Sequence, residues 1–243
     1  MSILLSGKVV LVTGASRGIG YFAAREAGRL GAHVVAVART VGGLEELDDE
    51  IKAAGSEATL VPLDLTDFDG IDRLGKAIFD RWGRLDGLIA NAGMLGTLTP
   101  VPHIDPKEFD RAFAVNVTAN YRLIRSLDLL LRQSPAGRAV FISSGIVPHA
   151  VPYFGMYTAT KMALEGVVKV YAAEMKSTNV RVNAMNPGPL RTALRAKGFP
   201  GEDPMSLKAP DVVAADIVRM IAPGYAENGM LFNFETGETR PIG

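Results

Sequence analysis

The chain has 243 residues, of which 48% are hydrophobic and 21% are charged. This balance is typical of a globular protein and excludes a largely disordered chain. Lys and Arg total 26 and Asp and Glu total 26, so the net charge of zero gives no overall attraction to nucleic acid or to an anionic membrane. The chain has no cysteine, which excludes disulfides, thiolate catalysis and Cys-based metal sites.

The N-terminal segment 1–7 has no basic start and only three consecutive strongly apolar residues, so it does not have the pattern of a signal peptide. No apolar stretch approaches the roughly 18 to 20 residues that a membrane helix needs. The three histidines are scattered without metal-ligand spacing. We therefore expect a cytoplasmic protein with no metal site that binds neither a membrane nor nucleic acid.

Short, almost wholly apolar segments alternate with longer helical patterns along the chain. The first kind predicts strands over 8–13, 32–38, 58–62, 85–90, 138–143, 180–185 and 229–234. The second kind predicts helices over 19–30, 41–54, a segment ending at Trp82, 105–132 and 156–177. Strands that are apolar throughout are typical of a sheet covered on both faces, and their alternation with helices indicates parallel βαβ units. The sequence therefore predicts one α/β domain over 1–243, a doubly wound (Rossmann) fold with a mainly parallel seven-stranded sheet and helices on both faces.

A glycine-rich turn, Thr13-Gly-Ala-Ser-Arg-Gly-Ile-Gly20, lies between the first predicted strand and the first predicted helix. Glycines there allow a tight turn and let a pyrophosphate approach the helix N-terminus, where free N–H groups favour anions. The glycine spacing alone is a weak signal, but its position inside a βαβ unit makes it a strong one. We therefore expect a bound dinucleotide.

The second predicted strand ends at Arg39-Thr40 and carries no carboxylate there. NAD sites place an acidic residue at this point to hold the ribose 2′-hydroxyl, whereas an arginine accommodates a 2′-phosphate. Arg17, inside the glycine turn, would approach the same ribose from the other side, and two guanidiniums suit a phosphate. The alternative is that both arginines are solvated surface residues. We expect NADP(H) in preference to NAD(H).

Tyr157 and Lys161 are four residues apart in a predicted helix and so share one face. A nearby ammonium lowers the pKa of a phenol, which is otherwise a poor acid or base at neutral pH. Such a pair is common by chance, but Ser144 follows the fifth strand, at the sheet edge where α/β proteins bind ligands. Ser143 is the alternative hydroxyl donor, although alternation along the strand puts the two serines on opposite sides.

Together these motifs resemble, in order and over nearly the whole chain, those of the short-chain dehydrogenase/reductase family. The glycine turn is similar to its TGxxxGxG motif, Tyr157 to Lys161 to its YxxxK motif, and Phe113 to Val117 to the segment that holds its helix asparagine. Within the family the chain resembles bacterial NADPH-dependent reductases similar to 3-oxoacyl-carrier-protein reductase. The glycine-rich ending common in those reductases is absent, which weakens the oxoacyl assignment and any transfer of their tetrameric assembly.

The resemblance implies a catalytic set of Asn116, Ser144, Tyr157 and Lys161. Tyr157 would give its proton to a carbonyl while NADPH gives a hydride, and Ser144 would polarise that carbonyl. Lys161 would lower the tyrosine pKa and hold the nicotinamide ribose. Asn116 would anchor a water that relays protons, and its alternative is an ordinary buried asparagine with satisfied hydrogen bonds.

The resemblance also implies a set of cofactor-binding residues. Asp64 and Leu65 would contact the adenine, and Asn91 begins the family's NAG motif. The full set is Gly14, Ser16, Arg17, Gly18, Ile19, Gly20, Arg39, Thr40, Asp64, Leu65, Asn91, Ala92, Gly93, Tyr157, Lys161, Pro187, Gly188 and Thr192.

Residues 189–209 are expected to form a short substrate lid. Its cations Arg191, Arg195 and Lys197 either attract an anionic substrate or carrier or are solvated. The wide apolar arc of 156–177 indicates either a subunit interface, which we favour, or a deeply packed helix. We expect a homodimer or homotetramer that transfers hydride between NADP(H) and a carbonyl or secondary alcohol, and the alternative is a non-catalytic NADP(H)-binding sensor or scaffold.

Overall fold

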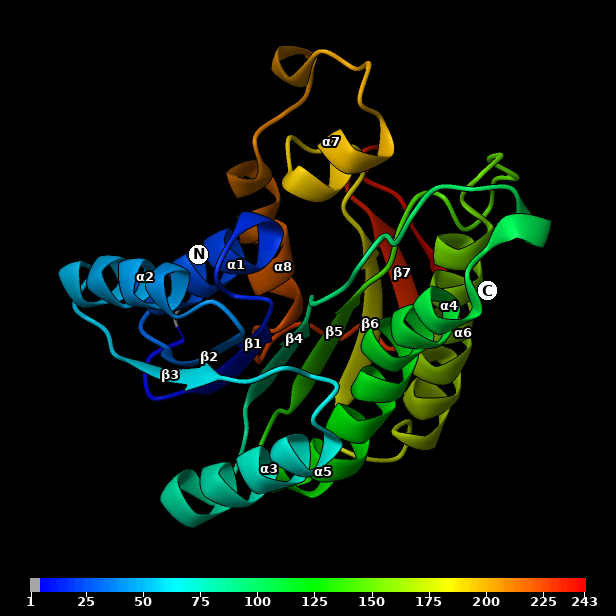
Figure 1. Cartoon of the computed structure of the whole chain (residues 1–243). Coiled ribbons are helices and arrows are strands. Elements are labelled where there is room, and N and C mark those ends of the chain that lie inside the picture. The colour runs from blue at the N-terminus through cyan, green and yellow to red at the C-terminus, as the bar shows by residue number, and fades with distance from the viewer. Residues whose placement is uncertain (1–4) are drawn as a thin grey trace.

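The structure is a computed structural model that describes residues 5–243; residues 1–4, part of the segment expected not to be a signal peptide, lie outside the described residues. Eight strands form one sheet in the order β3-β2-β1-β4-β5-β6-β7-β8 across this described part (Figure 1). Their bounds are β1 Val9–Thr13, β2 His33–Ala38, β3 Ala58–Pro62, β4 Gly87–Ala90, β5 Arg138–Ile142, β6 Arg181–Asn186, β7 Met230–Asn233 and β8 Thr239–Pro241.

Strands β1 to β7 are parallel, whereas β8 pairs antiparallel with β7 and places Arg240 opposite Leu231. The α/β expectation is confirmed, but the prediction of seven strands is wrong, because the sheet is mixed and has eight. Strand β8 has three exposed residues, one of them Pro241, and therefore lacks the apolar run on which strand prediction depends.

Helices cover both faces of the sheet because successive strand residues point to opposite sides. Leu11 and Phe141 belong to a core beneath α3 (Phe68–Trp82), α5 (Ala119–Gln133) and α6 (Gly155–Glu174). Their neighbours Val10 and Val140 belong to a second core beneath α1 (Gly18–Arg29), α2 (Val41–Ala53) and α8 (Ala214–Met220). Figure 1 shows these two layers on either side of the twisted sheet.

The helix predicted over 105–132 is three consecutive segments: α4 (Pro106–Phe113), a π-helical segment (Ala114–Thr118) and α5. Asp105 caps α4, and its side chain accepts a hydrogen bond of 2.9 Å from the backbone N–H of Glu108. The π-helical segment contains Asn116, and such widened turns occur often at functional sites.

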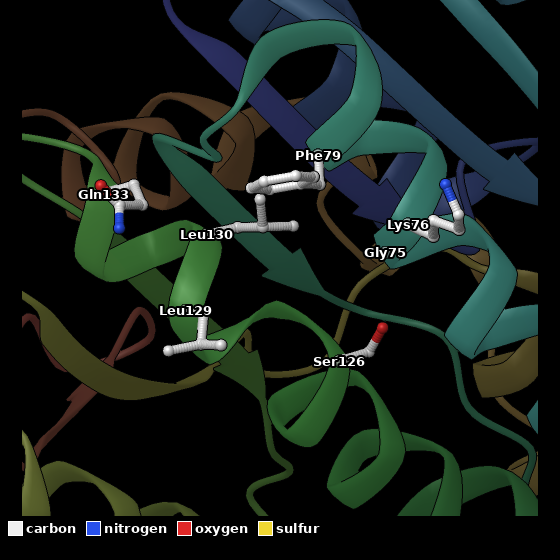
Figure 2. Close-up of a pocket in the computed structure, with 7 residues that line it drawn as sticks. All are labelled: Gly75, Lys76, Phe79, Ser126, Leu129, Leu130 and Gln133. Carbon is white, nitrogen blue, oxygen red and sulfur yellow. The ribbon is translucent and has the colours of Figure 1, made fainter.

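The remaining helical turns are α7 (Ala193–Gly198) and 3₁₀ turns at Val101–His103, Pro204–Ser206 and Pro210–Val213. A hollow between α3 and α5 is lined by Gly75, Lys76, Phe79, Ser126, Leu129, Leu130 and Gln133 (Figure 2). Lys76 is paired with Asp80 there, and the Ser126 hydroxyl donates to the Ile71 carbonyl, so this hollow offers apolar surface rather than chemistry. Within residues 5–243, no helix is long and apolar enough to cross a membrane, and no cluster of His, Asp or Glu could hold a metal ion.

Candidate active site

The predicted site residues gather at one edge of the sheet, because they follow the carboxyl ends of six parallel strands. Gly14 follows β1, Arg39 follows β2 and Asp64 follows β3. Asn91, Ser144 and Pro187 occupy the corresponding places after β4, β5 and β6. This is the edge at which open α/β sheets bind their ligands.

The glycine turn is packed so tightly that side chains cannot replace its glycines. Gly14 and Gly18 have φ values of +67° and +59°, which L side chains rarely adopt. A Cβ on Gly20 would collide with the carbonyl oxygen of Gly14 and with the side chain of Asn91. The turn thus has the close backbone approach that a phosphate cradle requires.

Asn91 and Ala92 fix the turn from the neighbouring strand. Their backbone N–H groups both donate to the Thr13 hydroxyl at 3.0 Å, and the Asn91 amide donates to the Thr13 carbonyl at 3.0 Å. The N-terminus of α1 has no side-chain cap. The N–H groups there remain free to receive an anionic ligand, because a capping side chain would otherwise accept from one of them.

Arg17, Arg39 and Thr40 are exposed beside the glycine turn. The Arg39 guanidinium lies 3.7 Å from a carboxylate oxygen of Asp64. Hydrogen bonds from the Thr66 backbone and hydroxyl lower the pKa of Asp64, and Arg39 adds to this effect. Arg39 and Asp64 therefore meet at the ends of β2 and β3, and Arg17 is exposed in the turn that follows β1.

The side chain of Asn116 is buried and connects two parts of the site. Its oxygen accepts from the Met94 N–H at 2.8 Å, and its amide donates to the Met94 carbonyl and to the Thr160 hydroxyl, both at 2.9 Å. These contacts fit the alternative that Asn116 is a buried asparagine with satisfied hydrogen bonds. They hold the segment after β4 against α6.

Ser144, Tyr157 and Lys161 come together at the junction of β5 and α6. The Ser144 hydroxyl is near enough to Tyr157 to affect the pKa of its phenol, and the Lys161 ammonium lies 5.8 Å from the Tyr157 ring centroid. Burial raises the pKa of Tyr157 to about 12, and the Ser144 hydrogen bond opposes this shift. Lys161 donates to the Ile142 carbonyl at 2.7 Å, and burial lowers its pKa to about 8. The expected lowering of the tyrosine pKa by Lys161 is thus not seen in this structure, where burial dominates.

The alternative donor, Ser143, has a different partner from Ser144. Its hydroxyl donates to the carboxylate of Glu165, and both side chains are buried. Glu165 is not among the residues predicted from the sequence. A charged residue in an apolar helix, four positions after Lys161, could have indicated it.

The segment after β6 returns to the glycine turn. Gly188 has a φ of +69°, and its N–H donates to the Asn186 side chain at 3.0 Å. Thr192 caps α7 by accepting from the Arg195 N–H, and its methyl group would lie 3.8 Å from a Cβ placed on Gly18. Thr192 is therefore next to the glycine turn.

The cations of the segment 189–209 have distinct environments. Arg195 forms two hydrogen bonds to Glu202, at 2.7 and 2.8 Å, and its guanidinium lies 3.6 Å from the centroid of the Phe199 ring. Phe199 in turn stacks on Phe154. Arg191 and Lys197 are exposed. The guanidinium of Arg195 is therefore already engaged by a carboxylate and a ring.

An apolar cluster covers Tyr157. It contains Leu95 and Phe154, with Leu98, Ile146, Val151 and Phe199 packed against them. Ile146, Val151 and Phe154 come from the loop between β5 and α6, in which His149 is exposed. The tyrosine hydroxyl therefore lies in apolar surroundings.

The comparisons with known proteins agree with this geometry. The family model described as short chain dehydrogenase matches residues 8–203. Because this match covers most of the chain, the protein belongs to the short-chain dehydrogenase family of oxidoreductases.

Individual relatives cover almost the whole chain. The oxidoreductase YciK of Escherichia coli strain K12 is 37% identical over 96% of this chain and 94% of its own length. A short chain dehydrogenase from Escherichia coli CFT073, solved with NADPH, is 36% identical with a TM-score of 0.90 and coverage of 95% and 98% of the two chains. A short chain dehydrogenase from Shigella flexneri 2a, solved with NADP, is 35% identical with a TM-score of 0.91 and coverage of 96% and 99%.

Proposed function

We propose that this oxidoreductase transfers a hydride between NADP(H) and a carbonyl or secondary alcohol, with Tyr157 as the general acid or base. The observation that carries the proposal is the proximity of Ser144, Tyr157 and Lys161, with Lys161 one helical turn after Tyr157, at the sheet edge that also holds the glycine turn. The chemistry needs a proton donor and a cofactor at the same edge, and the location of Tyr157 and of the glycine turn supports this arrangement.

The residues present fit a nicotinamide dinucleotide phosphate. The cradle at Gly14 and Gly20 admits only backbone, and the uncapped start of α1 suits a pyrophosphate. Arg17 and Arg39 suit a 2′-phosphate, and no carboxylate follows β2 directly to favour a free ribose hydroxyl. The structural relatives solved with NADPH and NADP support this preference.

In reduction, NADPH supplies the hydride and the chain supplies the proton. Tyr157 donates its hydroxyl proton to the carbonyl oxygen, and Ser144 donates a hydrogen bond to the same oxygen and orients it. Lys161 holds the nicotinamide ribose and places a positive charge beside the phenolate that forms. Asn116 holds the segment containing Met94 against α6, so that Gly93 borders both Asn116 and Lys161.

The surroundings of Tyr157 favour an uncharged substrate. A carboxylate or phosphate beside the reacting carbonyl would be desolvated against Leu95, Phe154 and Phe199. Arg195 cannot compensate, because Glu202 already holds it. Segment 189–209 then serves as a lid, and its Phe199 ring faces the reacting group. The narrower resemblance to 3-oxoacyl-carrier-protein reductases stays a hypothesis, which the assay with oxoacyl thioesters also tests.

The proposal is tested by measuring NADPH oxidation by wild type and Tyr157→Phe. The substrates are neutral ketones, aldehydes, their carboxylated analogues and oxoacyl thioesters. We expect turnover of the neutral compounds and a loss of about 100- to 10,000-fold in the variant, because the proton donor is missing. Tyr121→Phe, on exposed α5 surface, is the matched control and should keep the wild-type rate. Near-normal turnover by Tyr157→Phe would refute the assignment.

The second candidate is a sensor or scaffold that binds NADP(H) without catalysis. The same glycine cradle supports it, and it requires no contact between Ser144 and Tyr157. Tight NADPH binding, equal in wild type and Tyr157→Phe, with no turnover of any compound, would favour this function. A cytoplasmic location and assembly into a homodimer or homotetramer belong to both candidates and stay predictions.

A further inference from the structure

Glu165 is a buried carboxylate that the proposed reaction does not use. Its exposed fraction is 5%, and it lies one helical turn after Lys161 on α6. Within residues 5–243, the other buried charged side chains away from this site are Asp86 and Arg138, and both make several hydrogen bonds to backbone groups or side chains. Burying a carboxylate costs free energy unless it is paired or hydrogen-bonded, so the contacts of Glu165 indicate what it does.

Two contacts join α6 to the end of β5. Lys161 donates to the Ile142 carbonyl at 2.7 Å, and the Ser143 hydroxyl donates to the carboxylate of Glu165. Ile142 and Ser143 directly precede Ser144, which acts on the Tyr157 phenol. Residues four apart on a helix are neighbours on one face, so Lys161 and Glu165 hold successive residues of the strand end. The distance between Ser144 and Tyr157 therefore depends on this double attachment.

The electrostatic surroundings of Lys161 give Glu165 a second effect. The titratable groups that face Lys161 are Tyr157 and Glu165, both on α6, while β5 contributes the Ile142 carbonyl and the π-helical segment contributes the neutral Asn116. Among the described residues, Glu165 is the charged group that acts on Lys161. Burial lowers the pKa of Lys161 to about 8, and Glu165 opposes this shift.

We propose that Glu165 is a positioning residue of the reductase site, which keeps Lys161 charged and holds the end of β5 in register with α6. It does not touch the substrate and acts through Lys161 and Ser143. Its effect on turnover rests on the proposed function, whereas its effect on the charge of Lys161 does not. The two effects therefore need separate measurements.

A pair of variants separates the charge of Glu165 from its hydrogen bond. Glu165→Gln removes the charge and can still accept from Ser143, whereas Ser143→Ala removes the bond and keeps the charge. NMR of the full chain labelled with ¹³C-lysine follows the titration of Lys161, with Lys161→Met to assign its signal. We expect Glu165→Gln to lower the Lys161 midpoint by about one pH unit, because the variant removes the charge, one helical turn away, that opposes the effect of burial. Ser143→Ala should leave the midpoint within about half a unit of wild type.

The pH profile of kcat/KM for carbonyl reduction supplies the second measurement. Loss of the Lys161 proton lowers the rate at high pH, so this limb should move to lower pH in Glu165→Gln, and Glu165→Asp should restore part of the shift. Ser143→Ala should lower the rate several-fold at every pH without moving the limb. An unchanged Lys161 midpoint in Glu165→Gln would overturn the inference. If no protein, wild type included, turns over a carbonyl, the proposed function fails, and the Lys161 titration still decides the role of Glu165.

Discussion

At the scale of single residues, Arg39 selects the cofactor in our proposal. Arg39 and Asp64 lie 3.7 Å apart, and both side chains are largely exposed. Such ion pairs contribute only about 0 to 1 kcal/mol to stability. The guanidinium can therefore turn to a doubly charged phosphate at little cost. Two charge-assisted hydrogen bonds to that phosphate would exceed what the pair with Asp64 contributes.

Replacing Arg39 by Ala should weaken NADPH binding by about 10- to 100-fold, the loss expected for a charge-assisted hydrogen bond, and leave NADH binding almost unchanged. Titration of cofactor fluorescence gives both values of Kd. Arg29→Ala, at the other end of α1, is the control, since Arg29 pairs with Glu26 far from the turn. Equal losses for both cofactors would show that Arg39 does not read the phosphate.

The position of a residue can be predicted from the sequence when it follows from the end of a strand. It can hardly be predicted when it depends on an interacting side chain from another segment. Ser144 and Tyr157 lie near one another because one follows β5 and the other is in the first turn of α6. The partner of Arg195 was not predictable, because Glu202 lies beyond a loop whose path has no periodic signal. The pKa of Tyr157 differs from the expectation for the same reason, since burial depends on the surrounding cluster.

At the scale of elements, the glycine turn is the part with the least freedom to change. Gly20→Ala would push a methyl group into Gly14 and Asn91, and we expect it to destabilise the fold by about 1 to 3 kcal/mol, as overpacking does, and to weaken NADPH binding. Gly42→Ala, in the first turn of α2 with open space around it, is the control and should stabilise by about 0.5 to 1 kcal/mol. Urea unfolding compares the two, and equal stability would contradict the packing argument.

The apolar pattern of the sequence reveals neither the π-helical segment nor strand β8. The apolar periodicity over 105–132 is continuous, yet the π-helical segment adds a widened turn at Asn116, whose amide bonds to Met94 and Thr160. Strand β8 has no apolar run at all. Periodicity reports which face of an element is buried, and it cannot report an inserted residue or a three-residue exposed strand.

At the scale of the whole molecule, the parallel order of β1 to β6 explains why motifs far apart in the sequence form one site. Each crossover helix returns the chain to the same end of the sheet, so every strand delivers its last residues to a common edge. The gathering of the candidate site residues at one edge was therefore predictable from strand order, whereas the substrate was not. Substrate choice depends on the apolar cluster and on segment 189–209, whose contacts come from loops.

The outer faces of α5 and α6 bear on the assembly of whole molecules. Leu129 and Val170 are 72% and 58% exposed, and a hydrogen bond of 2.9 Å between Asp128 and Tyr171 holds the two helices together. Large apolar side chains gathered on exposed helices are typical of contact surfaces. This exposure agrees with the interpretation that the apolar arc of 156–177 forms a subunit interface. We therefore expect a second copy of the chain to cover these helices.

Val170→Asp should therefore shift the protein from a dimer or tetramer toward smaller species, because a charge buried in an apolar interface has no partner there. Sedimentation at several protein concentrations measures the change. Val212→Asp, a half-exposed valine in the 3₁₀ turn before α8, is the matched control and should assemble like wild type. A wild-type protein that sediments as a monomer at every concentration would contradict the expectation, and the apolar arc of α6 would then serve only its own core.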